Sequence, residues 1–207
     1  MRNERSVWFA RAIAICVLAV AVNFLLVLLR YSFQQPLFLG NMPFAAVAFV
    51  LGPVAGIAVV AASWVARGLY FGFFSLFVIV SVIEVLIIGT LRPMPRAEVR
   101  SASLANDRVV AAAYTFGRLF ILYIVCVLAV SVSGGIISTL VYGPALPYET
   151  EIDALKLGLQ VDPMPPLLAS ILSRVLVNLA DRFLVVFGGY GVSMLCRKWL
   201  YRTKARQ

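Results

Sequence analysis

The sequence contains no histidine, and its 207 residues include only three cysteines and 13% charged residues. The absence of histidine excludes His-based catalytic triads, zinc sites of the usual kind and an ordinary titrating switch near neutral pH. Cys16, Cys126 and Cys196 have no metal-type or redox-type spacing and lie in or beside apolar stretches, which is typical of packing residues. No cofactor is therefore expected.

Motifs that carry enzyme chemistry are also missing. The chain has no GxxxxGK[ST] nucleotide loop, no GxSxG serine elbow, no HExxH metal helix and no acidic cluster of the phosphotransferase kind. We therefore expect that the protein is not an enzyme. Any ATPase that drives a process through it must be a partner protein.

Long polar stretches are scarce too, since the two longest, 92–108 and 144–166, are too short to fold as separate soluble domains. Instead, 62% of the residues are hydrophobic and the mean hydropathy is +0.97, whereas apolar residues make up about half of a soluble domain. This composition predicts one all-α integral membrane domain over 1–207, embedded in a lipid bilayer. Its first apolar run exceeds signal-peptide length, so we expect a retained first helix.

The basic residues, which give a net charge of +9, form three clusters and no stripe with interleaved aromatics. This pattern disfavours nucleic acid as a partner and fits the excess of basic residues in cytoplasmic loops. Both termini and 92–108 are then cytoplasmic, and 144–166 is external. The clusters are Arg2, Arg5 and Arg11; Arg92, Arg96, Arg100 and Arg108; and Arg197, Lys198, Arg202, Lys204 and Arg206.

The stretch 37–56, LFLGNMPFAAVAFVLGPVAG, contains an apolar core that ends at Gly52-Pro53 and is shorter than the roughly 20 residues of a normal crossing. Charge parity requires an odd number of crossings between 41 and 91, and three fit only as short, bent or partly re-entrant helices. Such helices survive where protein or a water-filled cavity satisfies the backbone, so a binding site is expected nearby. The six predicted spans are about 7–29, 41–51, 54–70, 73–91, 109–142 and 166–195.

Four charged residues, Glu84, Arg118, Asp181 and Arg182, fall inside predicted spans. A charge at the bilayer centre costs about 3 kcal/mol or more and is tolerated where it faces protein or water. Because Glu84, Arg118 and Asp181 have similar depths, we expect Arg118 to pair with Glu84 or Asp181. The pair either locks three helices together or takes part in ligand contact or coupling.

Two further polar residues, Arg174 and Asn178, lie closer to the outside on the last span and share a face with Arg182 by four-residue spacing. Aromatic side chains near the external edge either stack on a ligand ring or belong to an interfacial belt. The candidate ligand contacts are Arg174, Asn178, Tyr31, Phe33, Phe38 and Glu84.

Ala10 and Ala14 form a small-xxx-small pair on the first span. Together with Ala12 they give a smooth strip that permits close helix contact. The strip serves either as a docking surface for another membrane protein or as an internal packing surface.

The stretch LFLGNMPFAAVAFVLGPVAGIAVVAASWVARGLYFG resembles the loop, short second helix and GP-initiated third helix of the substrate-binding S components of energy-coupling factor (ECF) transporters. Ala10 and Ala14 are similar to the docking motif of that family, and VNLADRFLVVFGGYGV at 177–192 is similar to its Asn-and-Asp pattern in the final helix. The resemblance implies a subunit of a prokaryotic cytoplasmic membrane that binds a vitamin-like molecule from outside. It also implies docking on a transmembrane coupling (T) protein with two ATPase subunits.

Two alternatives remain open at this point. A membrane sensor or assembly module would bind a partner but no transported solute. A stand-alone proton-coupled carrier using Glu84 or Asp181 would take up its substrate into liposomes without ATP. No vitamin-specific signature matches Glu84, Asp181 or 144–166, so the sequence does not specify which ligand is bound.

Overall fold

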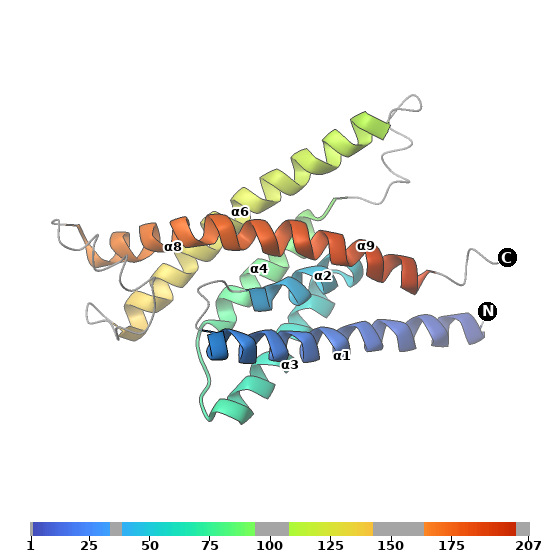
Figure 1. Cartoon of the computed structure of the whole chain (residues 1–207), viewed down its shortest axis with the longest axis horizontal. Helices are drawn as coiled ribbons and strands as arrows, with labels where there is room; N and C mark the ends of the chain where they lie inside the picture. The colour runs from blue at the N-terminus through green and yellow to red at the C-terminus, as the bar shows by residue number, and fades with distance from the viewer. Residues whose placement is uncertain (1, 34–38, 94–107, 143–163, 202–207) are drawn as a thin grey trace.

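A computed structural model of the chain describes residues 2–33, 39–93, 108–142 and 164–201, and every regular element in these ranges is helical (Figure 1). The all-α class expected from the sequence is confirmed. The elements are α1 Arg2–Phe33, the 3-10 turn η1 Leu39–Asn41, α2 Met42–Leu51, α3 Pro53–Phe71, α4 Val78–Leu91, α6 Arg108–Tyr142, α8 Pro166–Phe183, the π-helical segment η2 Leu184–Gly188 and α9 Gly189–Leu200.

Three helices of this bundle contain stretches that are long and apolar enough to cross a membrane, namely Ser6–Leu29, Pro53–Phe71 and Ala111–Val141. They indicate a multi-pass membrane protein. The apolar helices α2 and α4 have only 10 and 14 residues, and charged and polar side chains interrupt α8. The count of six crossings therefore stays a prediction.

The beginning of α1 and the end of α9 lie at the same end of the bundle (Figure 1). There, Arg11 Nη1 donates hydrogen bonds to the carbonyl oxygens of Trp199 and Leu200 at 3.2 and 3.4 Å. The Arg11 guanidinium also lies 5.6 Å from the centroid of the Trp199 ring. These contacts tie the first helix to the last.

The central helix is α2, which contacts α1, α3, α4 and α9, and its residues 43–49 are all buried. It ends at Gly52, whose φ of 98° favours glycine, and α3 begins directly at Pro53. The carbonyl oxygen of Phe49, near the end of α2, accepts hydrogen bonds from Arg197 Nη2 at 2.7 Å and Arg92 Nη1 at 3.2 Å. Positive charge is stabilising at the C-terminal end of a helix. The short α2 therefore ends inside the protein with carbonyl oxygens of its last turn hydrogen-bonded to arginines.

Small residues bring α3 and α4 together. A Cβ on Gly89 would lie 2.6 Å from the backbone nitrogen of Pro53, and one on Gly56 would lie 3.1 Å from the Cβ of Ala48 and 3.3 Å from that of Val85. Such approaches are possible only where side chains are minimal. The Gly52-Pro53 turn, which joins α2 to α3, is therefore packed closely against α4.

One predicted span begins in the wrong place. The stretch 73–91 was expected to be one helix, but α3 ends at Gly72, with a φ of 75°, and α4 starts only at Val78. The Phe74 ring folds back over Gly68, where an added Cβ would lie 2.3 Å from it. This contact joins residues six positions apart and lies at the segment 72–77, which separates α3 from α4. The last helix also runs past the expected end at 195, to Leu200.

Candidate functional site

Three charged side chains meet inside the bundle: Glu84 from α4 and Asp181 and Arg182 from α8, with exposed fractions of 1%, 0% and 2%. Arg182 donates through Nη1 to Glu84 Oε1 and through Nη2 to Asp181 Oδ2. The second oxygen of Glu84 accepts a hydrogen bond of 2.7 Å from Asn41 Nδ2, just before α2. We call these four residues the ion-pair centre. The forked guanidinium suits this arrangement because it binds two carboxylates at once.

This geometry corrects the predicted partner of the carboxylates. Arg118 was expected to pair with Glu84 or Asp181, but Arg182 binds both. The Arg118 guanidinium instead lies over the ring of Tyr114 on its own helix, 5.6 Å from the centroid. The reason is helix orientation, since Arg182 faces the interior whereas Arg118 is only partly buried.

A second polar contact adjoins the ion-pair centre. Asn23 of α1 is completely buried, donates to the Gly40 carbonyl oxygen at 2.5 Å and accepts a hydrogen bond of 2.7 Å from Arg67 of α3. The Arg67 guanidinium also lies 4.8 Å from the centroid of the Trp64 ring. Since Gly40 precedes Asn41, a polar network runs from α1 and α3 through η1 to the ion-pair centre.

The network contains two acidic side chains, Glu84 and Asp181, and two basic ones, Arg67 and Arg182. Opposite charges in equal number reduce the cost of burying them in a medium of low dielectric constant. Asn23, Asn41 and Arg67 were not predicted as site residues. The sequence signal that these three residues offered is that each is polar and lies inside or directly beside an apolar stretch.

The predicted ligand contacts Arg174 and Asn178 lie along the seam between α6 and α8. Asn178 Nδ2 donates to Ser131 Oγ of α6 at 2.9 Å. The Arg174 guanidinium lies over the ring of Phe77, 5.2 Å from its centroid, just before α4. Ser170 Oγ of α8 also donates to the Gly135 carbonyl oxygen of α6 at 3.5 Å, and Ser138 of α6 and Ser173 of α8 are buried. The seam thus offers hydrogen-bonding groups within an otherwise apolar bundle.

Of the remaining predicted site residues, the structure describes the side chains of Ala10 and Ala14 but not those of the aromatic residues. Tyr31 and Phe33 lie in the last turn of α1, but their side chains fall outside the described residues, as does all of Phe38. Ala10 and Ala14 are exposed on α1, where a docking strip requires them to be. Their roles in ligand or partner binding stay predictions.

Two residues after Arg182, at Leu184, the regular α-helix gives way to the π-helical segment η2. Such widened turns occur mostly as short interruptions and are frequent at functional sites. The Leu179 carbonyl oxygen, one turn before, accepts a hydrogen bond of 2.9 Å from the Tyr123 hydroxyl of α6. The helix irregularity and the ion-pair centre therefore occupy the same part of the last helix.

Within the described part of the chain, no group of three or more Cys, Asp or Glu side chains is placed to hold a metal ion. Comparisons with models of protein families, with curated proteins and with solved structures found no match for this chain.

Proposed function

We propose that this chain is the substrate-binding S component of an ECF-type transporter in a prokaryotic cytoplasmic membrane, and that it is not an enzyme. It crosses the membrane six times with both ends inside and captures a vitamin-like small molecule from outside. A T protein carrying two ATPase subunits then drives uptake. Its own residues bind the solute and the T protein.

The observation that carries this proposal is the short helix α2. Asn41, just before its first residue, binds Glu84 of the ion-pair centre, and its last turn is satisfied by Arg92 and Arg197. A membrane domain tolerates such an interrupted helix where protein or a cavity satisfies the backbone, and interrupted helices often form solute sites. The Gly52-Pro53 interruption is also the centre of the ECF resemblance.

The solute site lies between the outer parts of α6 and α8 in this proposal. Arg174 and Asn178 donate hydrogen bonds to the ligand, and the segment from Tyr31 to Phe38 covers it. Glu84, the deepest of the predicted contacts, bounds the site from below through the ion-pair centre. The proton-coupled alternative is less favoured, because Arg182 already binds both Glu84 and Asp181.

A ligand screen by thermal shift on the purified protein tests the binding part of the proposal. A ligand at one hundred times its dissociation constant should add about 2.7 kcal/mol to the free energy of unfolding. Asn178→Ala and Arg174→Ala are each expected to remove most of that ligand-induced shift. Ser133→Ala is the matched control, because its hydroxyl donates to the Ala129 carbonyl of its own helix at 2.6 Å. An unchanged shift in the first two variants would take both residues out of the site.

Co-purification tests the partner. The tagged wild-type chain is expected to retain a T-type membrane protein and its ATPases, and Ala10→Trp or Ala14→Trp should reduce that recovery at least fivefold by adding a bulky ring to the docking strip. Ala112→Trp, at an exposed position of α6, should leave it unchanged. Recovery of a kinase or a regulator as the sole partner would instead support a sensor.

A further inference from the structure

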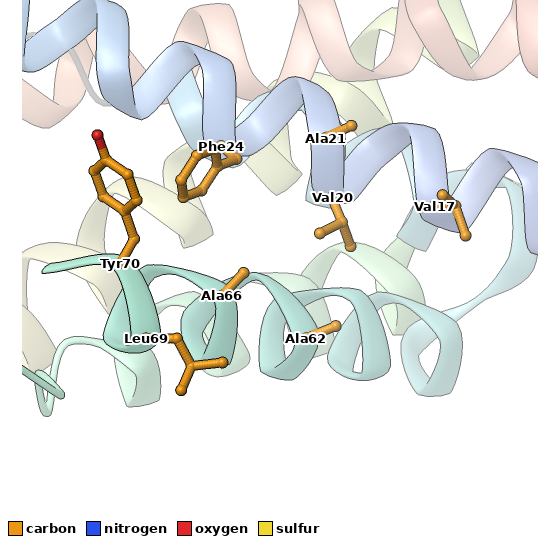
Figure 2. Close-up of a pocket in the computed structure, with 8 residues that line it drawn as sticks. All are labelled: Val17, Val20, Ala21, Phe24, Ala62, Ala66, Leu69 and Tyr70. Carbon is orange, nitrogen blue, oxygen red and sulfur yellow. The ribbon is translucent and has the colours of Figure 1, made fainter. Parts of the chain in front are cut away.

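A groove of about 730 Å³ lies between α1 and α3, away from the ion-pair centre. Figure 2 shows its two walls, with the side chains of Val20 and Phe24 on α1 facing those of Ala62, Ala66 and Tyr70 on α3, and Ala21 also lines the groove. The three alanines create the depression because their side chains are short. The two walls run in the same direction, since Figure 2 shows Val20 across from Ala62 and Phe24 beside Tyr70.

The chemistry of the groove is that of a hydrocarbon site. All of its lining side chains are apolar apart from the Tyr70 hydroxyl. Both walls belong to helices that are long and apolar enough to cross a membrane, so the groove faces the bilayer interior. Water gains no hydrogen bonds from such walls, and a hydrocarbon chain fits their chemistry.

The position of the groove along α1 and α3 restricts its occupant to one leaflet of the bilayer. The lining residues of α1 fall in 17–24 and those of α3 in 62–70, so on both helices they run from the middle of the apolar stretch, Ser6–Leu29 or Pro53–Phe71, toward its C-terminal end. Eight helical residues extend over about 12 Å, close to the roughly 15 Å depth of one hydrocarbon leaflet. The groove is therefore about as long as the buried part of a lipid tail.

One end of the groove is closed by aromatic rings. The rings of Phe24 and Tyr70 meet edge to face with their centroids 5.3 Å apart, and Figure 2 shows them side by side at this end. Tyrosine favours the membrane–water interface, which places this end near the lipid headgroups. A transmembrane helix about 10 Å wide would meet the ring pair as it ran along the groove, whereas a thin flexible chain can end against it.

We propose that the groove is a binding site for one acyl chain of a membrane phospholipid. The lipid lies in the leaflet where α1 and α3 end, and its headgroup is placed beyond the Phe24–Tyr70 pair. Because the tail is in hydrocarbon before and after binding, retention comes from dispersion contacts with the concave wall. The site is independent of the proposed transport function and requires only that α1 and α3 lie in the bilayer.

Native mass spectrometry of the purified full-length chain in detergent micelles tests this site. The sample is incubated with phosphatidylglycerol or phosphatidylethanolamine of identical acyl chains, and the fraction of protein that retains one lipid is measured. Ala62→Phe fills the groove and is expected to lower that fraction at least fivefold for both lipids. Ala66→Phe, one turn further along, should give the same loss. Ala61→Phe is the control, since Ala61 is exposed on α3 but does not line the groove.

Equal lipid retention in wild type, Ala62→Phe and Ala66→Phe would overturn the proposal. The co-purification experiment can be repeated with Ala62→Phe and Ala66→Phe. If these variants lost the T protein but retained as much lipid as wild type, the proposal would also be overturned, because the occupant would then be a protein helix. A loss in Ala61→Phe as large as in Ala62→Phe would show non-specific lipid around the chain and would likewise remove the site.

Discussion

Replacement of Arg182 by methionine is expected to lower the free energy of unfolding by about 3–5 kcal/mol, because it leaves two carboxylates buried without their cation. Glu84 and Asp181 are both almost completely inaccessible, and both bind this guanidinium. Methionine retains much of the unbranched, flexible shape of the side chain, so the loss reports the charge more than the packing. Thermal and denaturant unfolding in micelles, followed by tryptophan fluorescence, measures the change.

The same substitution at the predicted partner provides the control. Arg118→Met removes a cation that lies over Tyr114, and a contact of this kind at a partly exposed site contributes about 0.5–1 kcal/mol. The combination of Arg182→Met with Glu84→Gln should recover part of the loss, because one of the two buried charges is removed as well. If Arg118→Met destabilised the protein as much as Arg182→Met, the assignment of Arg182 as the central cation would be wrong.

A second large effect is expected where α3 crosses α4. Gly89→Ala should destabilise the protein by about 1–3 kcal/mol, because the new Cβ would lie 2.6 Å from the Pro53 nitrogen and 2.7 Å from its Cα. Neither atom can move aside, since both belong to the backbone at the Gly52-Pro53 turn. The helices must separate by several tenths of an ångström or more, which would also disturb the start of α3.

Gly117→Ala gives the opposite expectation for the same chemical change. Gly117 lies inside α6, in its first third, and an added Cβ there meets no atom within 4 Å. Alanine is favoured over glycine in a helix by about 0.5–1 kcal/mol, so this variant should be as stable as wild type or more so. Unfolding midpoints of the two variants, measured side by side, should therefore move in opposite directions. A shift of both in one direction would contradict the close α3–α4 crossing.

The helices were predictable wherever the signal was local. The apolar run that begins near Asn41 and the Gly52-Pro53 stop gave the extent of α2 to within one residue, because glycine and proline act on their immediate neighbours. The start of α4 was not predictable in this way. Before Val78 the ring of Phe74 folds over Gly68, a packing contact that has no counterpart in hydropathy.

The charged residues that make up the site were predictable, but which arginine binds the two carboxylates was not. Counting residues along the predicted spans put Glu84 and Asp181 at a similar depth in the membrane. In the structure the two carboxylates bind the same arginine. Sequence depth does not give the rotation of each helix about its axis, and that rotation selected Arg182 over Arg118. Asn23 and Arg67 were missed because their partners come from other helices and from the Gly40 carbonyl, far away in the sequence.

The two arginines that satisfy the last turn of α2 have a consequence for biosynthesis. Arg197 is separated from its acceptor at Phe49 by 148 residues. At translation rates of 5–20 residues per second, the ribosome adds that length in roughly 7–30 s. The nascent α2 lacks both anchoring arginines until Arg92, 43 residues after Phe49, has been added, and it lacks Arg197 for the whole interval. A messenger truncated before codon 197 therefore yields a chain in which the last turn of α2 has Arg92 but never receives Arg197.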